Sequence, residues 1–279
     1  MVEGSFMKSI LDIRIKEGAP YFKNGSIIKI LDRLKIKKES LKEFKLLDKR
    51  IVRVSIPPNY DKNAYYYNVS KTMEKYKWNS VSIRGNRVYD MDYLDDFQKS
   101  MISFGIVKSI SIILINNKKS IKNSFIAIED GGNTKNLPII EECAKHTKRM
   151  LLIAKDFKKA SNIRNYIIAN YGVSPEITVN FNSIKGVDFI ITEKNREYNA
   201  ERIWYLDSFY RPYSNKGLFV NDISFSIDNY KEKFSPELLG ALLKPDKKVN
   251  KYIEDYIISN KVRIEDISFG DKEIEMNFY

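Results

Sequence analysis

The sequence predicts an α/β protein in which a mixed N-terminal region precedes a parallel sheet. Between Ser124 and Glu193, short apolar runs alternate with amphipathic segments of helical length. This alternation is typical of parallel strands joined by right-handed helical crossovers. The length of 279 residues favours two domains over one. No apolar run approaches the roughly 20 residues that span a bilayer, so we expect a soluble protein without a membrane partner.

Residues 1–118 are predicted to form the N-terminal mixed α/β domain. Apolar positions recur at helical spacing from Ile27 to Lys49, which predicts two short helices. The alternating run from Ile51 to Ile56 predicts a strand that stops at Pro57, because proline cannot donate to a ladder. Further along we expect helices at 64–78 and 90–104, the second ended by Gly105, and strands at 80–83 and 109–115.

Residues 119–201 are predicted to form a Rossmann-like parallel-sheet domain. Pro138 fits the first turn of one helix, and Gly172 is well placed to end the next. We expect strands at 125–128, 150–154, 177–181 and 187–191, with helices at 137–145 and 157–171. Residues 202–279 are predicted to be an α+β extension that completes or bridges the domains. In it we expect a strand at 217–227, helices at 236–243 and 247–259, and two strand-like runs within 264–278.

The sequence contains one cysteine, Cys143, and one histidine, His146. These counts exclude an internal disulfide, a thiolate cluster, a multi-histidine metal site and most hydrolase triads. We therefore expect no metal site of that kind and a reducing, cytoplasmic location. A carboxylate site for Mg²⁺ remains open at Asp90, Asp92, Asp95 and Asp96, although acidic side chains also favour a helix start without a metal.

The net charge of +12 and the pI near 9.4 raise the question of nucleic-acid binding. The sequence is rich in Lys, Asn, Ile and Tyr together, which indicates an AT-rich genome rather than a built basic site. A nucleic-acid partner is therefore an alternative that we do not favour. The aromatic residues of the extension fit either base stacking or ordinary packing. They are Trp204, Tyr205, Phe209, Tyr210 and Tyr213, with Arg202 and Arg211 between them.

The turn after the first strand of the parallel unit carries Gly131, Gly132, Asn133 and Thr134. In the first βα turn of a dinucleotide-binding unit, glycine lets the backbone approach a phosphate, which the start of the following helix receives. The full G-x-G-x-x-G fingerprint is absent. A tight turn that needs a positive φ explains the same two glycines.

The end of the second strand supplies the other candidate site residues. The stretch Ala154-Lys155-Asp156-Phe157-Lys158-Lys159-Ala160 resembles the one that follows the second strand in shikimate-dehydrogenase-like NADP domains. The resemblance implies NADP as cofactor, with Lys155 at the position that holds the 2′-phosphate and Lys159 in the Lys-Ala pair. Asp156 stands where that family has threonine. The family's catalytic lysine motif is not matched, because the nearest string, Asn68-Val69-Ser70-Lys71, lacks its proline and its spaced lysine.

The sequence therefore predicts a soluble two-domain protein that binds a nucleotide or small ligand through Gly131 to Thr134, Lys155 and Lys159. The alternatives are an NADP-dependent oxidoreductase and, after it, a basic nucleic-acid-binding protein. Whether the protein is an enzyme, and its oligomeric state, stay open at this point.

Overall fold

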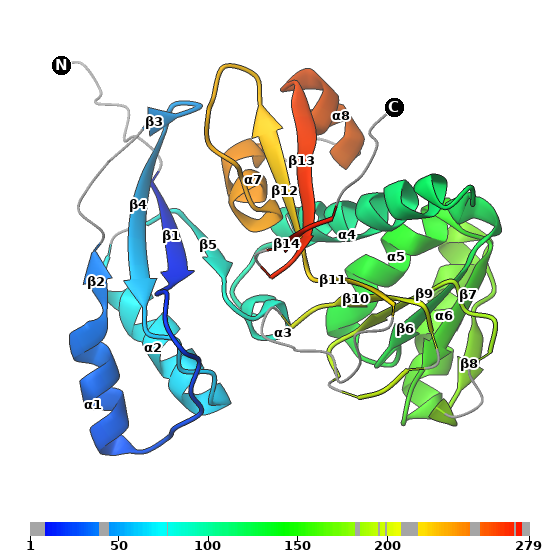
Figure 1. Cartoon of the computed structure of the whole chain (residues 1–279), viewed down its shortest axis with the longest axis horizontal. Helices are drawn as coiled ribbons and strands as arrows, with labels where there is room; N and C mark the ends of the chain where they lie inside the picture. The colour runs from blue at the N-terminus through cyan, green and yellow to red at the C-terminus, as the bar shows by residue number, and fades with distance from the viewer. Residues whose placement is uncertain are drawn as a thin grey trace. The chain divides into compact units, whose positions relative to one another are not determined.

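The computed structural model describes residues 9–38, 45–76, 78–181, 185–194, 196–198, 200–207, 217–245, 252–270 and 272–274. The chain forms two compact units (Figure 1). Unit 1 contains residues 1–98 and 237–249, and unit 2 contains residues 99–236 and 250–279. β14 (Lys272–Glu273) falls in the second strand-like run expected at the C-terminus. Phe209, Tyr210, Arg211 and Tyr213 lie outside the described residues. The domain limits at residues 118 and 201 stay predictions.

Unit 1 is built on a sheet whose three longest strands are parallel. Its order is β2-β4-β1-β5, with β3 pairing with β4. The strands are β1 (Ser9–Ile15), β2 (Lys37–Lys38), β3 (Lys45–Leu46), β4 (Lys49–Ile56) and β5 (Ser80–Arg84). The helices are α1 (Ser26–Lys35), α2 (Lys62–Lys75), α3 (Arg87–Asp90) and most of α7 (Pro236–Leu243). Glu237 of α7 accepts from Arg87 at 2.8 Å, and both side chains are buried.

Of the two helices predicted between Ile27 and Lys49, the first is α1. Residues 39–44, where most of the second would lie, are outside the described residues, and the described residues on either side form the short strands β2 and β3 and not helix. Leu47 and Asp48 both have positive φ, at 48° and 59°, and they join β3 to β4. A two-residue connection with this geometry is a hairpin turn. The hairpin therefore overrides the helical spacing of the apolar residues.

The predicted strand at 109–115 is wrong, because these residues belong to α4 (Asp96–Asn116). The helix is apolar on most sides, so its sequence has no helical period and resembles a buried strand. Gly105 does not end it; a Cβ there would lie 3.1 Å from Ile223, so the glycine allows close packing. α4 is long and apolar enough to cross a membrane, but 67% of its most apolar stretch is buried, as in a core helix of a soluble protein.

Unit 2 is built on a six-stranded parallel sheet with the order β11-β10-β9-β6-β7-β8. Numbered from β6, this order is 6-5-4-1-2-3, which is the strand order of a dinucleotide-binding Rossmann sheet. The Rossmann-like prediction is therefore confirmed. The strands are β6 (Phe125–Glu129), β7 (Arg149–Ile153), β8 (Glu176–Thr178), β9 (Phe189–Thr192), β10 (Arg202–Tyr205) and β11 (Leu218–Val220).

The crossover helices of this sheet belong to its first half. α5 (Leu137–His146) joins β6 to β7, and α6 (Phe157–Tyr171) joins β7 to β8. Gly172 ends α6 in the left-handed conformation, with φ 69°, as predicted. In the described parts of the connections from β8 to β9, β9 to β10 and β10 to β11, no α-helix forms. Crossover helices thus join β6 to β8, whereas the described parts of the connections from β8 to β11 contain no α-helix.

Both faces of the six-stranded sheet are packed. One face carries an apolar cluster that includes Ala127, Ile190 and Tyr205, with Phe181 and Phe269 packed against it. On the other face, the buried Trp204 donates its indole N–H to Ser109 of α4 at 2.9 Å. A smaller antiparallel sheet and one helix complete unit 2. They are β12 (Asp222–Ile227), β13 (Val262–Phe269), β14 (Lys272–Glu273) and α8 (Ile253–Ser259).

Candidate functional site

The candidate site is a pocket at the carboxyl ends of β6 and β7. It has a volume of about 470 Å³. Five of the six predicted site residues line it, together with Asp130, Ala154 and Asp156: they are Gly132, Asn133, Thr134, Lys155 and Lys159. Ligands of open α/β sheets bind outside the strand carboxyl ends, so this location is the one that the strand order favours.

The two glycines are needed for close packing, and the interpretation based on positive φ is wrong for them. In this turn the positive φ belongs to Asp130, at 51°. A Cβ on Gly131 would lie 2.7 Å from the Cβ of Leu152 and 3.0 Å from its Cα, so Gly131 lies against β7 and not in the pocket lining. A Cβ on Gly132 would lie 3.2 Å from the backbone nitrogen of Ala160. The turn therefore lies tightly against β7 and the start of α6.

The turn contributes Gly132, Asn133 and Thr134 to the pocket lining. Asn133 caps the short 3₁₀ helix Thr134–Asn136 by accepting from the N–H of Lys135 at 3.1 Å. Asn136 also holds the turn in place, because its side-chain amide donates to the carbonyl of Glu129 at 3.1 Å. Among the described residues, the N–H groups of Gly132 and Thr134 make no hydrogen bond. Both remain available to an acceptor such as a phosphate oxygen.

Two lysines form the opposite wall of the pocket at the start of α6. Asp156 is the N-cap of that helix and accepts from the backbone N–H of Lys159 at 3.0 Å. The carboxylate of Asp156 is therefore already hydrogen-bonded at the start of α6, where a negative charge is favourable even without a ligand. Lys159 Nζ lies 3.9 Å from Asp156, and its side chain is 72% exposed. Lys155 follows β7, and its charge, after the stronger effects of burial and of Lys194, helps to lower the pKa of Asp130.

The crevice between β6 and β9, where the strand order reverses, is filled by a buried carboxylate and its partners. Glu129 ends β6 and is 3% exposed. It accepts hydrogen bonds from Thr192 at the end of β9 and from Tyr198, and it pairs with the guanidinium of Arg196. Arg196 also lies over the ring of Phe181, 3.7 Å from its centroid. These contacts close the crevice with side chains of this chain.

A second group of charges covers the same edge. Lys194 Nζ lies 2.7 Å from Asp130 and 2.5 Å from Glu193. Burial raises the pKa of Glu193, and its hydrogen bond with Asp130 raises it further. Burial would also raise the pKa of Asp130, but hydrogen bonds from Lys194 and Glu193 bring it below its ordinary value. Two carboxylates, those of Asp130 and Glu193, therefore share the Lys194 ammonium at this edge of the sheet.

Sequence reasoning missed Glu129, Lys194, Arg196 and Tyr198. The one signal available was an acidic residue directly after four apolar residues, Phe125 to Ile128, since a charge at the end of a buried strand needs a partner. The partners follow the next strand of the sheet but come more than sixty residues later in the chain. Without the sheet order, nothing in the sequence connects them.

The acidic residues considered for Mg²⁺ do not gather at one point. Asp90 is buried and accepts from Tyr65 at 2.5 Å, whereas Asp92 accepts from Tyr66 at 2.6 Å. Asp95 caps the start of α4 by accepting from the N–H of Gln98 at 3.0 Å. Hydrogen bonds within unit 1 thus account for Asp90, Asp92 and Asp95.

The single histidine, at the end of α5, lies close to two carboxylates. His146 Nε2 is 3.3 Å from Glu142 and 4.0 Å from Glu254 of α8. These three residues present ligand atoms within 4.8 Å of one another. Lys145 also pairs with Glu142 at 2.6 Å. Burial would raise the pKa of Glu142, but hydrogen bonds with His146 and Lys145 bring it below its ordinary value. An ion-pair cluster at the end of α5 explains this geometry. Cys143 beside it is buried in the core, as predicted.

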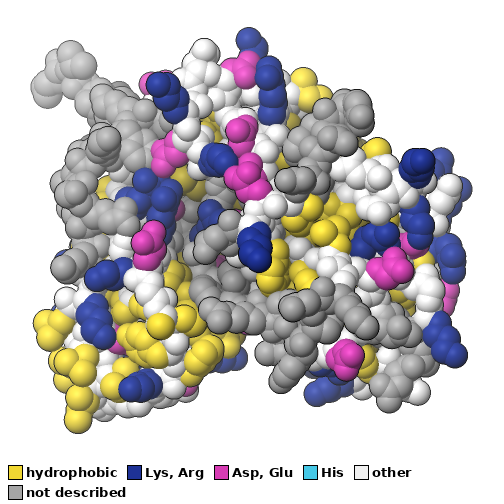
Figure 2. Space-filling model, viewed as in Figure 1, with side chains coloured by type: hydrophobic (Ala, Val, Ile, Leu, Met, Phe, Trp, Pro, Cys, Tyr) yellow, Lys and Arg dark blue, Asp and Glu magenta, His cyan; other side chains and the backbone are white. Residues whose placement is uncertain are grey.

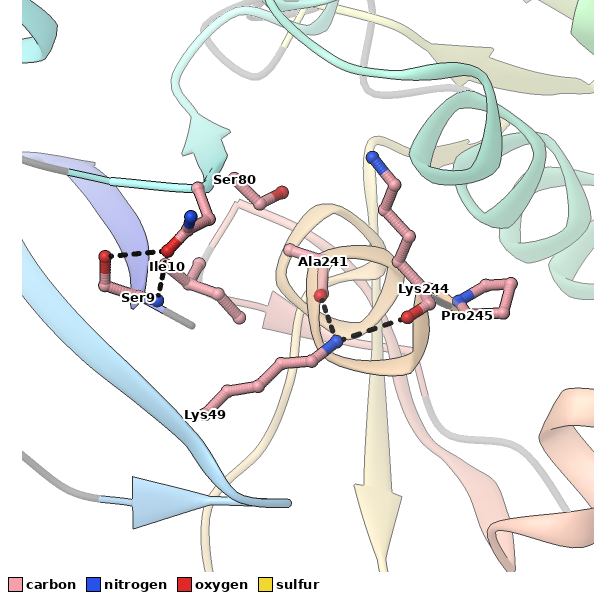
Figure 3. Close-up of a pocket in the computed structure, with 8 residues that line it drawn as sticks. Ser9, Ile10, Lys49, Ser80, Ala241, Lys244 and Pro245 are labelled. Atoms are coloured by element: carbon pink, nitrogen blue, oxygen red, sulfur yellow. Dashed lines mark hydrogen bonds between the residues drawn. The ribbon is translucent and has the colours of Figure 1, made fainter. Parts of the chain in front are cut away.

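Two other cavities are explained by structural roles. In unit 1 a cavity of about 170 Å³ lies beside the end of α7 (Figure 3). Its central cation, Lys49, donates to the carbonyls of Ala241 and Leu242 at 3.0 and 2.5 Å and so caps the helix. In unit 2 a cavity of about 520 Å³ is lined by Arg202 and Leu218, which begin β10 and β11. It lies at the amino ends of these strands, where sheets of this order do not bind ligands.

Comparison with known proteins gives a remote structural resemblance. No family model and no curated protein matches the chain. A shikimate dehydrogenase in complex with NADP⁺ is similar at 13% identity and a TM-score of 0.32, over 67% of each chain. Quinate dehydrogenase from Corynebacterium glutamicum in complex with NAD is similar at 8% identity and a TM-score of 0.33, over 67% of this chain and 71% of that one. The 5-ketofructose reductase of Gluconobacter sp. strain CHM43 gives 14% and 0.33, over 70% and 75%.

These similarities bear out the remote resemblance to shikimate-dehydrogenase-like proteins. The identities and TM-scores are too low to transfer a residue's role. The strand order of unit 2 shows independently that this is a protein with a Rossmann-like domain.

Proposed function

We propose that unit 2 binds a phosphate-bearing ligand of mononucleotide size in the pocket at the ends of β6 and β7, without catalysing a reaction. The observation that carries this proposal is the convergence of Lys155 and Lys159 on the turn that contains Gly132 and Thr134. Ammonium groups and backbone N–H groups together favour an anion. The volume of about 470 Å³ lies within the range of small-ligand pockets, which is about 300–1,000 Å³.

The limit on ligand size comes from the contrast between the two halves of the sheet. A dinucleotide lies across the crevice at which the strand order reverses. In this protein that crevice holds Glu129 with Thr192, Tyr198 and Arg196. A second nucleotide half would have to displace a buried charged network, at a cost of several kcal/mol. One phosphate and one nucleoside need no such displacement.

The position of Lys155 favours a ligand with a 2′-phosphate on its ribose. The end of the second strand contacts the adenosine ribose in dinucleotide sites, and a basic residue there favours a 2′-phosphate. Asp156 keeps its negative charge and opposes that phosphate in part, but its carboxylate caps α6 and lies 3.9 Å from Lys159 Nζ, which offsets that charge. We therefore expect adenosine 2′,5′-bisphosphate to bind more tightly than adenosine 5′-monophosphate.

Calorimetric titration of the full chain with these two nucleotides tests the proposal. The double variant Lys155→Glu/Lys159→Glu should weaken binding of the bisphosphate at least roughly tenfold, because charge-assisted hydrogen bonds contribute about 1.5–3 kcal/mol. Lys158→Glu is the matched control, since it changes an exposed lysine in the same stretch that does not line the pocket. Equal affinity in all three proteins would contradict the site.

The alternative function is an NADP-dependent oxidoreductase of the shikimate-dehydrogenase-like type. It requires the Glu129 network to open so that a nicotinamide half can enter. NADPH that binds at least tenfold more tightly than adenosine 2′,5′-bisphosphate would favour this alternative, provided that Lys155→Glu weakens both ligands. Gly131→Val is unsuitable for this experiment, because a side chain there meets Leu152 whether or not a ligand binds.

A further inference from the structure

Helix α1 of unit 1 turns its apolar side chains toward solvent. Ile27, Ile30, Leu31 and Leu34 are 74%, 59%, 46% and 74% exposed. Their spacing of three and four residues places them on one face of the helix, in a stripe about 100° wide. Phe22, in the segment just before the helix, is 69% exposed. Figure 2 shows hydrophobic side chains gathered at the lower left, where α1 lies in Figure 1.

The outward direction of this stripe is built into the fold, because the inward face of α1 is fixed by a polar residue. Asp32 is 1% exposed. Its carboxylate accepts from the hydroxyl of Tyr21 at 2.5 Å and from the amide of Asn59 at 2.7 Å. Asn68 of α2 donates to it at 3.4 Å. Rotating α1 to bury the stripe would expose or orphan this buried carboxylate, so the helix is held with its apolar face outward.

Cations border the stripe on both sides. On a helical wheel, Arg33 lies next to Ile30 and Lys35 lies on the opposite flank. Lys23 precedes the helix. Within the part of the chain that the structure describes, none of these three cations pairs with a carboxylate. An apolar face bordered by unpaired Lys and Arg is typical of a helix that lies in a membrane interface.

We infer that α1 is a docking surface for an anionic lipid bilayer. Through this helix the otherwise soluble protein binds peripherally to the bilayer. The charge pattern decides the occupant. A second copy seated on the stripe would bring Arg33 and Lys35 of both copies together, in a chain whose net charge is already +12. An anionic bilayer accepts the apolar side chains and attracts the bordering cations at the same time. The sequence-based expectation of no membrane partner rested on spanning segments and did not address a helix of this kind.

Co-sedimentation of the full chain with vesicles tests this inference. The vesicles contain phosphatidylcholine alone or with about 30 mol% phosphatidylserine, which sets the surface potential. We expect binding to the mixed vesicles, at least tenfold weaker binding to phosphatidylcholine, and loss of binding as salt rises. Ile27→Glu/Leu34→Glu should weaken binding to mixed vesicles at least tenfold. Arg33→Gln/Lys35→Gln should weaken it roughly thirtyfold, since each of the two surface cations contributes about 1 kcal/mol.

The matched control is Val179→Glu/Ile258→Glu, which adds the same charges at apolar residues that are 61% and 75% exposed in unit 2. It should bind mixed vesicles within twofold of the unchanged protein. Circular dichroism of each variant separates lost binding from lost folding. Three results would overturn the inference: no binding to mixed vesicles, equal weakening by the control, or a dimer that Ile27→Glu/Leu34→Glu converts to monomer while vesicles stay unbound.

Discussion

The two halves of the unit 2 sheet share one strand order and differ in what lies at their carboxyl ends. The half from β6 to β8 has crossover helices and leaves an open pocket bordered by Lys155 and Lys159. The half from β9 to β11 has no α-helix in the described parts of its connections, and Tyr198 and Arg196 turn inward to Glu129. Strand order therefore locates a site, whereas the side chains at the strand ends decide how much of it is open.

The strongest way to break this comparison is to remove the carboxylate that closes the second half. Glu129→Ala leaves the hydroxyls of Thr192 and Tyr198 without their acceptor, and we expect a loss of about 3 kcal/mol in the free energy of unfolding. Urea denaturation measures it. Glu129→Gln keeps an acceptor and should lose less. A loss below about 0.5 kcal/mol for the alanine variant would show that the network does not hold the crevice closed.

The buried carboxylate of Asp90 in unit 1 extends the comparison. Among the described residues no ion pair joins it to a cation, whereas Glu129 pairs with Arg196. Burial raises the pKa of Asp90 to about 7, although hydrogen bonds from Tyr65 and Gly85 oppose the rise. A raised pKa in the folded state means that the stabilising contribution is present below the unfolded value near 3.8 and is lost as the pH rises through about 7. We expect stability to fall by about 2 kcal/mol between pH 5 and pH 8.

Urea denaturation across this pH range measures the effect, and Asp90→Asn is the control because it cannot titrate. Its stability should change less over the same range. An identical pH dependence in both proteins would show that another group is responsible.

The smallest expected effect concerns the dinucleotides themselves. Since the crevice between β6 and β9 is filled, NADH and NADPH at about 1 mM should each change the melting temperature by less than a few degrees. Thermal denaturation measures the shift. A large increase with NADPH that Lys155→Glu abolishes, and that Lys158→Glu leaves unchanged, would show that the second half opens and would make the reductase the better interpretation.

The sequence predicted the first half of this sheet well and the second half poorly, for a physical reason. Residues 125–172 carry local signals: continuous apolar strands, Pro138 in a first turn, and Gly172 at a helix end. The later strands are short, and Arg202 to Tyr205 has no alternation that separates a strand from the rest of the extension. α4 was misread because a helix buried on most sides loses its period. Five of the six predicted site residues met in one pocket because strand ends of a parallel sheet share an edge.

The position of α7 in unit 1 has a consequence for the order in which the chain becomes structured during synthesis. Residues 237–249 complete a unit whose other part ends at residue 98, and the buried Arg87 finds its partner Glu237 only in that late stretch. A ribosome must therefore release the whole intervening segment before Arg87 is neutralised. Ordering residues 99–236 first would bring the two ends of that long loop nearer and reduce the entropy of closing it. We therefore expect unit 1 to be completed late in synthesis, after residues 99–236 have emerged.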